Sequence, residues 1–204
     1  MSTFSLEHVD FFIEAVDVVV EKVDLFNDTR ADIKNLFQGE NRMNSFVGYQ
    51  SPEIFEGMTF TVNSISQTTG SFDSYGLNYS KGSLKVAIAS DSNAKGYDNK
   101  RFASTFSLDS LDIDVGVLYQ TTKKLSTGIS ENGHVFSLKK NVFEKGSIYY
   151  QISSSDIKLE SGEQNSFGYT HKISKVSKVF VHASNLESDT KSVDYISVGF
   201  EYKF

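Results

Sequence analysis

The sequence predicts an all-β fold, a transmembrane antiparallel up-and-down β-barrel, and three observations lead to this prediction. Apolar and polar residues alternate at every second position in many short segments, which places them on opposite faces of a strand. The links between these segments are alternately short and long along the chain. The longest unbroken apolar run, residues 86–89, is far below the ~20 residues that a membrane helix needs.

Residues 1–22 fit the strand pattern least. Val9, Phe12, Val16 and Val20 recur at helical spacing, so a helix is the expectation here, although the β-branched residues weaken it. The first twelve residues, MSTFSLEHVDFF, have neither the basic start nor the apolar stretch of a secretory signal peptide. This segment therefore has no assigned place in the fold.

Eleven strands are predicted between residues 42 and 204, forming a meander of hairpins. In the clearest of them, the last, Ile196, Val198 and Phe200 alternate with Ser197 and Gly199. The eleven strands centre on residues 47–49, 58–62, 75–79, 84–88, 102–108, 111–120, 136–138, 148–152, 167–173, 179–183 and 193–204.

The links between the strands alternate in length, as tight turns on one side of a membrane and longer loops on the other would produce. The short links are residues 80–83, 109–110, 143–146 and 174–177. The long polar links are residues 64–74, 91–101, 122–133, 154–165 and 185–192.

Alternation alone does not say which face of the sheet is apolar, the inner or the outer one. A soluble or surface-attached binding protein would bury the apolar face, whereas a water-filled barrel in lipid would expose it. Charged residues at mid-strand positions of the less apolar face favour a wet interior. These candidates for the interior are Lys85, Asp112, Asp114, Lys172, Glu201 and Lys203.

The composition argues against several functions. There is no cysteine, so thiolate metal sites and disulfides are excluded. The net charge is −6, with 20 basic against 26 acidic residues, which argues against nucleic-acid binding. The four histidines lack the spacing of a metal site, and no nucleotide-binding or nucleophile motif is present, so we expect no enzyme activity, cofactor or metal.

Residues 23–204 resemble the general porins of Gram-negative outer membranes. The resemblance rests on the stretches DLFNDT at 24–29, ADI at 31–33, NR at 41–42, NS at 44–45 and YQSP at 49–52, and on the closing VGFEYKF at 198–204. Residues 23–41 are similar to the inward-folded third loop of that family, and residue 42 onward to its sixth and later strands. Phe204 matches the C-terminal Phe that acts as the family's assembly signal.

The resemblance implies a homotrimeric channel for passive diffusion of small hydrophilic solutes and ions, in contact with outer-membrane lipid. Because the family barrel has sixteen strands, the eleven strands here would be numbers six to sixteen, and the barrel would be truncated at its N-terminal side, without its signal peptide. An inactive porin fragment therefore stays an alternative. The resemblance places seven charged residues at the pore constriction: Asp24, Asp28, Arg30, Asp32, Lys34, Glu40 and Arg42.

Overall fold

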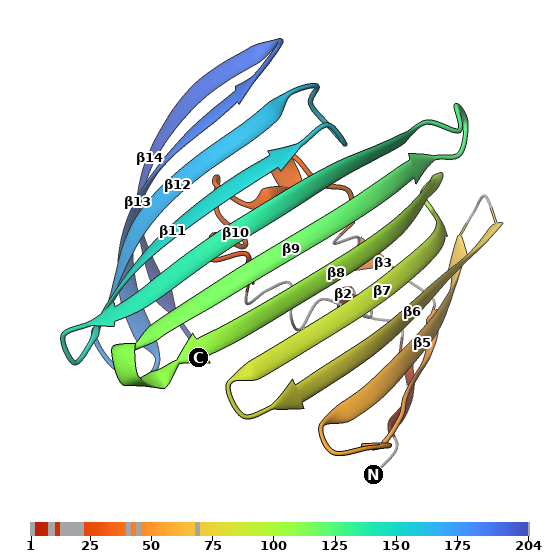
Figure 1. The fold of residues 1–204 in the computed structure, drawn as a ribbon, viewed down its shortest axis with the longest axis horizontal. Helices are drawn as coiled ribbons and strands as arrows, with labels where there is room; N and C mark the ends of the chain where they lie inside the picture. The colour runs from red at the N-terminus through yellow and green to blue at the C-terminus, as the bar shows by residue number, and fades with distance from the viewer. Residues whose placement is uncertain are drawn as a thin grey trace.

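The computed structural model describes residues 3–7, 11–12, 23–39, 42–43, 46–67 and 70–203. Its main element is one curved antiparallel sheet of twelve strands in the order β1-β4-β5 and onward to β14 (Figure 1). From β4 onward every strand pairs with the next one along the chain. The fold is therefore all-β and up-and-down, as predicted.

All eleven predicted strands are present, as β4 to β14. Most have ten or more residues, because alternating side chains and a continuous ladder of main-chain hydrogen bonds extend each hairpin. Their bounds are β4 Phe46–Gln50, β5 Met58–Gln67, β6 Gly70–Lys81, β7 Leu84–Ala94, β8 Tyr97–Leu108, β9 Ile113–Lys124, β10 Ser130–Val142, β11 Gly146–Ser155, β12 Gly162–Lys172, β13 Ser177–Ser188 and β14 Lys191–Tyr202.

A twelfth strand of the sheet, β1 (Thr3–Glu7), was not predicted. It pairs antiparallel with β4, from Thr3 opposite Gln50 to Glu7 opposite Phe46. The expectation of a helix is also wrong at Phe11–Phe12, which form β2 and pair with β3 (Arg42–Met43). Residues 8–10 and 13–22, the rest of the expected helix, lie outside the described residues.

The added strand changes the count that the resemblance implied. Counted on the sixteen-stranded barrel that the resemblance implies, the twelve strands would be numbers five to sixteen, because β1 precedes the segment similar to the third loop and pairs with β4. The described sheet thus has an even number of strands, as bacterial barrels do.

The expected alternation of short and long links is seen only in part. The links at 125–129 and 156–161 are longer than those at 143–145 and 173–176, but two other links predicted to be long are two-residue turns. β7 ends at Ala94 and β8 begins at Tyr97, so most of the polar stretch 91–101 lies within strands. The two linking residues, Lys95 and Gly96, have φ values of 52° and 88°, the left-handed pair that a tight hairpin turn requires. The strands continue beyond their apolar part because the hydrogen-bond ladder needs no apolar side chains.

The face of the sheet that points away from its hollow is apolar and exposed. On β14, Ile196 and Val198 are 82% and 80% exposed, and Phe200 follows at 61%. The alternate positions face the hollow and include buried polar side chains such as Gln120 and Gln151. This is the reverse of a soluble barrel, which buries its apolar face.

The sheet has two edges, β1 and β14, and no ladder joins them within the described residues. In Figure 1 the strands curve around a central hollow, with β14 at one side and β5 near the other. Within the same described ranges, no helix is long and apolar enough to span a membrane.

Candidate functional site

Residues 23–39, here called the inner segment, lie on the concave face of the sheet (Figure 1). The segment carries a short 3₁₀ helix, η1 (Ile33–Asn35), which Asp32 caps by accepting a hydrogen bond from the main-chain N of Lys34. Its apolar side chains form the main hydrophobic core together with small and aliphatic side chains of the wall. The core residues are Val23, Ile33, Leu36, Phe37, Ala87, Ala89, Ala103, Leu118, Val135, Ile157 and Leu186.

Glycines of the wall make room for the inner segment. A Cβ atom at Gly133 of β10 would lie 2.5 Å from Cε1 of Phe37, and one at Gly162 of β12 would lie 2.7 Å from Cδ2 of Leu36. Real Cβ contacts are not that short, so a side chain at either position would displace the segment. The concave face is therefore shaped to receive this segment.

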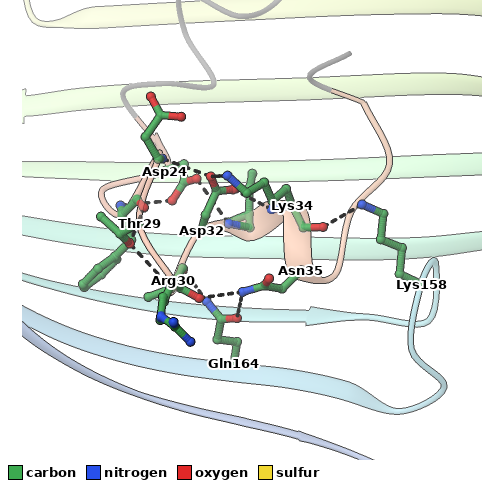
Figure 2. A network of polar contacts seen from close by, with 12 residues as sticks. Asp24, Thr29, Arg30, Asp32, Lys34, Asn35, Lys158 and Gln164 are labelled. Atoms are coloured by element: carbon green, nitrogen blue, oxygen red, sulfur yellow. Dashed lines mark hydrogen bonds and ion pairs between the residues drawn. The ribbon is translucent and has the colours of Figure 1, made fainter. Parts of the chain in front are cut away.

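Glutamines of the wall hold the main chain of the inner segment. Gln151 of β11 accepts a hydrogen bond from the N of Leu25 at 2.8 Å, and Gln164 of β12 donates one to the carbonyl of Ala31. Asn35 donates to Oε1 of Gln164 at 3.0 Å and thereby completes that link (Figure 2). Main-chain groups that the segment would otherwise bury unpaired are thus satisfied.

A second anchor holds the far end of the segment. Arg101 of β8 and Gln120 of β9, both buried, each donate a hydrogen bond of 2.7 Å to the carbonyl of Gln38. Arg101 also donates from Nε to Oε1 of Gln120 at 2.8 Å. Sequence reasoning missed these wall residues, because the sequence does not show which strands lie opposite the segment.

Two of the predicted constriction acids, Asp24 and Asp32, are buried and hold the segment's own fold. Asp24 accepts hydrogen bonds from the N of Phe26 at 3.1 Å, the N of Ile33 at 3.2 Å and Nε2 of Gln151 at 3.0 Å. Asp32 accepts from the N of Asp28 at 3.0 Å (Figure 2). Both carboxyl groups therefore organise the loop.

Burial changes the acidity of Asp24. Loss of hydration, together with the nearby charge of Asp32, raises the pKa of Asp24 to about 7, although its three hydrogen bonds work in the opposite direction. Asp24 lies in the inner segment, outside the strands. Close to neutral pH this carboxyl group thus carries only part of a negative charge.

The other predicted constriction residues do not all lie on the inner segment. Asp28, Arg30 and Lys34 are exposed on the inner segment, and Nζ of Lys34 lies 2.8 Å from Oδ2 of Asp32. In Figure 2 the guanidinium group of Arg30 points away from the network that holds the segment. Glu40 lies outside the described residues, and Arg42 belongs to β3.

The predicted wall residues are placed mainly at one end of the sheet. Lys85, Asp114 and Lys172 occupy concave positions on β7, β9 and β12. Glu201 of β14 lies 2.7 Å from Nζ of Lys178 and 3.9 Å from Nζ of Lys203.

The two remaining predicted residues are Asp112 and Phe204. Asp112, expected at mid-strand, is exposed in the turn between β8 and β9, where it closes the 3₁₀ helix η2 (Asp109–Leu111) with a φ of 52°. Apolar alternation continues through Leu111, so the sequence placed the start of the strand too early. Phe204 lies outside the described residues.

Among the residues that the structure describes, no three His, Asp or Glu side chains are grouped as metal ligands.

Comparison with known proteins identifies the fold. No protein-family model and no curated protein sequence matches the chain. Among solved structures, Salmonella typhi OmpF, in complex with daunomycin, superimposes with a TM-score of 0.79 at 12% identity, covering 99% of this chain and 75% of that one. An anion-selective porin from Comamonas acidovorans gives 0.73 at 15% identity, covering 100% and 74%. A mutant of the Rh. blastica porin gives 0.69 at 14% identity, covering 100% and 73%. The chain thus has the fold of the Gram-negative outer-membrane porins, and the predicted barrel class is confirmed.

Proposed function

We propose that the chain forms the wall of a water-filled channel in the outer membrane of a Gram-negative bacterium. Small hydrophilic solutes and ions pass through it by passive diffusion, and the channel needs no cofactor. As in the porins that it resembles, the assembled unit is a homotrimer.

One observation carries the proposal: the polarity of the two faces. The outward face exposes large apolar side chains strand after strand, from Ile88 on β7 to Val198 on β14, at 52% and 80% exposure. In water such a continuous apolar surface would be unfavourable, whereas lipid stabilises it at about 25 cal/mol per Å² of buried surface. The concave face is polar and suits water.

The inner segment supplies the narrowing that a selective channel requires. It lies inside the hollow, is held by buried side chains of four strands, and exposes Asp28, Arg30 and Lys34. Fixed charges beside a narrow passage act strongly on ions because low-dielectric walls focus the field. We assign these three side chains to the passage.

The two sheet edges set a condition on the proposal. In lipid, the unpaired main-chain groups of β1 and β14 each need a partner. The working channel therefore includes strands that continue the sheet between these edges. The porin structures above support this, because the chain covers only 73–75% of their length.

Reconstitution of the chain together with the strands that continue the sheet between β1 and β14 tests the proposal. We expect β structure to form only with detergent or lipid, and stepwise current through a planar bilayer after the protein is added. Detergent alone and protein refolded without detergent are the controls. A monodisperse β-rich protein in detergent-free buffer would instead identify the soluble binding protein, and a folded, inserted but electrically silent protein would identify the inactive alternative.

A further inference from the structure

Three lysines form a cluster on the concave face, and the side chains that hold the main chain of the inner segment are other residues. Lys139 of β10, Lys172 of β12 and Lys178 of β13, here called the lysine cluster, line one pocket between the wall and the inner segment. β11 lies between β10 and β12, so the three side chains come from one patch of the wall. Each lies within four residues of a strand end, at the same end of the sheet.

The inner segment and the wall add hydroxyl groups to this pocket. Thr29 of the segment and Tyr149 and Thr170 of the wall line it together with the lysines. The hydroxyl groups of Tyr149 and Thr170 lie 2.8 Å apart and hydrogen-bond each other. A ligand here would meet ammonium groups and hydroxyl donors, the combination that binds carboxylate or phosphate oxygens.

Acidic neighbours neutralise the cluster only in part. Lys178 pairs with Glu201 at 2.7 Å, whereas Lys139 is 4.0 Å from Asp114, at the limit of an ion pair. Lys172 makes no ion pair with any of the described residues. These pairs are about two-fifths exposed, so water weakens them and the ammonium groups stay available to a solute.

The remaining carboxyl group of the pocket is Asp24, and its charge is reduced. Burial raises the pKa of Asp24 to about 7, and its hydrogen bonds point into the inner segment and to Gln151. The pocket is therefore positive, in a chain whose net charge is −6. The net charge of the chain, which is negative, therefore does not explain why three lysines lie together in this pocket.

We propose that the lysine cluster is a transient binding site for small anions, carboxylates or phosphates, and that it gives the channel a preference for anions over cations. This inference rests on the proposed function, since it concerns what passes through the channel. The site lies between the wall and the inner segment, where a passing solute is close to both. Weak binding is sufficient, because a conducting site must also release its ion.

Selectivity measurements on the same reconstituted channel test the inference. Currents in a KCl gradient give the ratio of chloride to potassium permeability, for the native chain and for Lys139→Gln, Lys172→Gln, Lys178→Gln and the triple variant. We expect a native ratio above one. Replacing one lysine should lower the ratio by at most about 25-fold, because a charge ~4 Å away in water changes the occupancy of chloride and of potassium by about fivefold each, in opposite directions. The fall should diminish at ~1 M salt, where screening acts within about 3 Å.

Lys100→Gln is the matched control, because Lys100 is exposed on the opposite face of β8 from the concave residue Arg101. It removes the same charge and should leave the ratio unchanged. Added inorganic phosphate provides a second readout of the same site. It should reduce the native chloride current in a saturable way, and block of the Lys172→Gln channel should need a higher phosphate concentration.

The outcomes separate the two proposals. A native channel that prefers potassium, or a triple variant with an unchanged ratio and unchanged phosphate block, overturns the anion site while the channel function stands. Absence of any channel overturns the proposed function and, with it, the anion site.

Discussion

The two faces of the sheet differ in their surroundings: the outward face is apolar and exposed, whereas the concave face contacts the inner segment. The concave face itself has two parts, one packed against the inner segment and one open. The outward face carries exposed large apolar side chains at alternate positions of most long strands. The concave face has a dry part, where Gly133, Gly162 and small core residues receive the inner segment. It also has an open part, where the lysine cluster lies.

This difference shows that alternation is a weak guide to the inner face. Contact with lipid asks only that a side chain be apolar, so each outward position is specified by its type. The dry part of the concave face depends on contacts across the hollow, such as Phe37 against Gly133. Period-two alternation therefore predicts which side chains are apolar and face outward. It carries no information on which side chains contact each other across the concave face.

The largest effect is expected from a charge on the outward face. Val198→Arg should destabilise the inserted protein by about 2–4 kcal/mol, because an arginine at the middle of the bilayer is poorly solvated. Ser197→Arg adds the same side chain one residue earlier, on the concave face, and should cost much less. Urea unfolding in lipid vesicles measures both values. Equal losses would mean that the outward face does not contact lipid.

A side chain in the dry part of the concave face should release the inner segment. Gly133→Leu overpacks the contact with Phe37 and should destabilise the packed segment by about 1–3 kcal/mol. Trypsin cleavage after the exposed residues Arg30 and Lys34 reports the released form. His134→Leu places leucine on the exposed outward face beside it and should leave the cleavage rate unchanged. Faster cleavage in both variants would contradict the assigned contact.

The strands could be predicted from the sequence, but most of the contacts that position the inner segment could not. Alternation placed β4 to β14 because each hairpin pairs with its neighbour along the chain. It missed β1, whose five residues pair with β4 about forty residues away, across the inner segment. The resemblance indicated that residues 23–41 fold inward, and residues 23–39 do lie on the concave face.

The roles of individual polar residues could not be predicted, for a physical reason. Arg101 and Gln120 occupy concave positions where any polar residue would satisfy the alternation. Their binding of the Gln38 carbonyl follows from the path of the segment through the hollow. In the same way, the sequence shows Asp24 and Asp28 as equivalent acids, although one is buried and the other is exposed.

Those two acids give a third test of the divided concave face. Asp24→Ala leaves the main-chain N–H groups of Phe26 and Ile33 without their acceptor, and each unpaired buried group costs about 1–3 kcal/mol before water enters to relieve it. Asp28→Ala removes an exposed carboxyl group and should change stability by less than about 0.5 kcal/mol. Trypsin cleavage at Arg30 again measures release of the segment. Equal rates in the two variants would show that Asp24 does not organise the loop.

The smallest change is one proton on Asp24, and it should make the packing of the inner segment depend on pH. The packed segment raises the pKa of Asp24 from 3.8 to about 7, so it holds the proton more tightly than the released segment does. This stabilisation is therefore complete below about pH 4 and is lost as the pH rises to about 7. We expect hydrogen exchange of residues 23–39, corrected for its intrinsic pH dependence, to show at least about tenfold more opening at pH 8 than at pH 5. Asp24→Asn cannot titrate and should remove this difference, whereas an equal difference in that variant would show that Asp24 is not the titrating group.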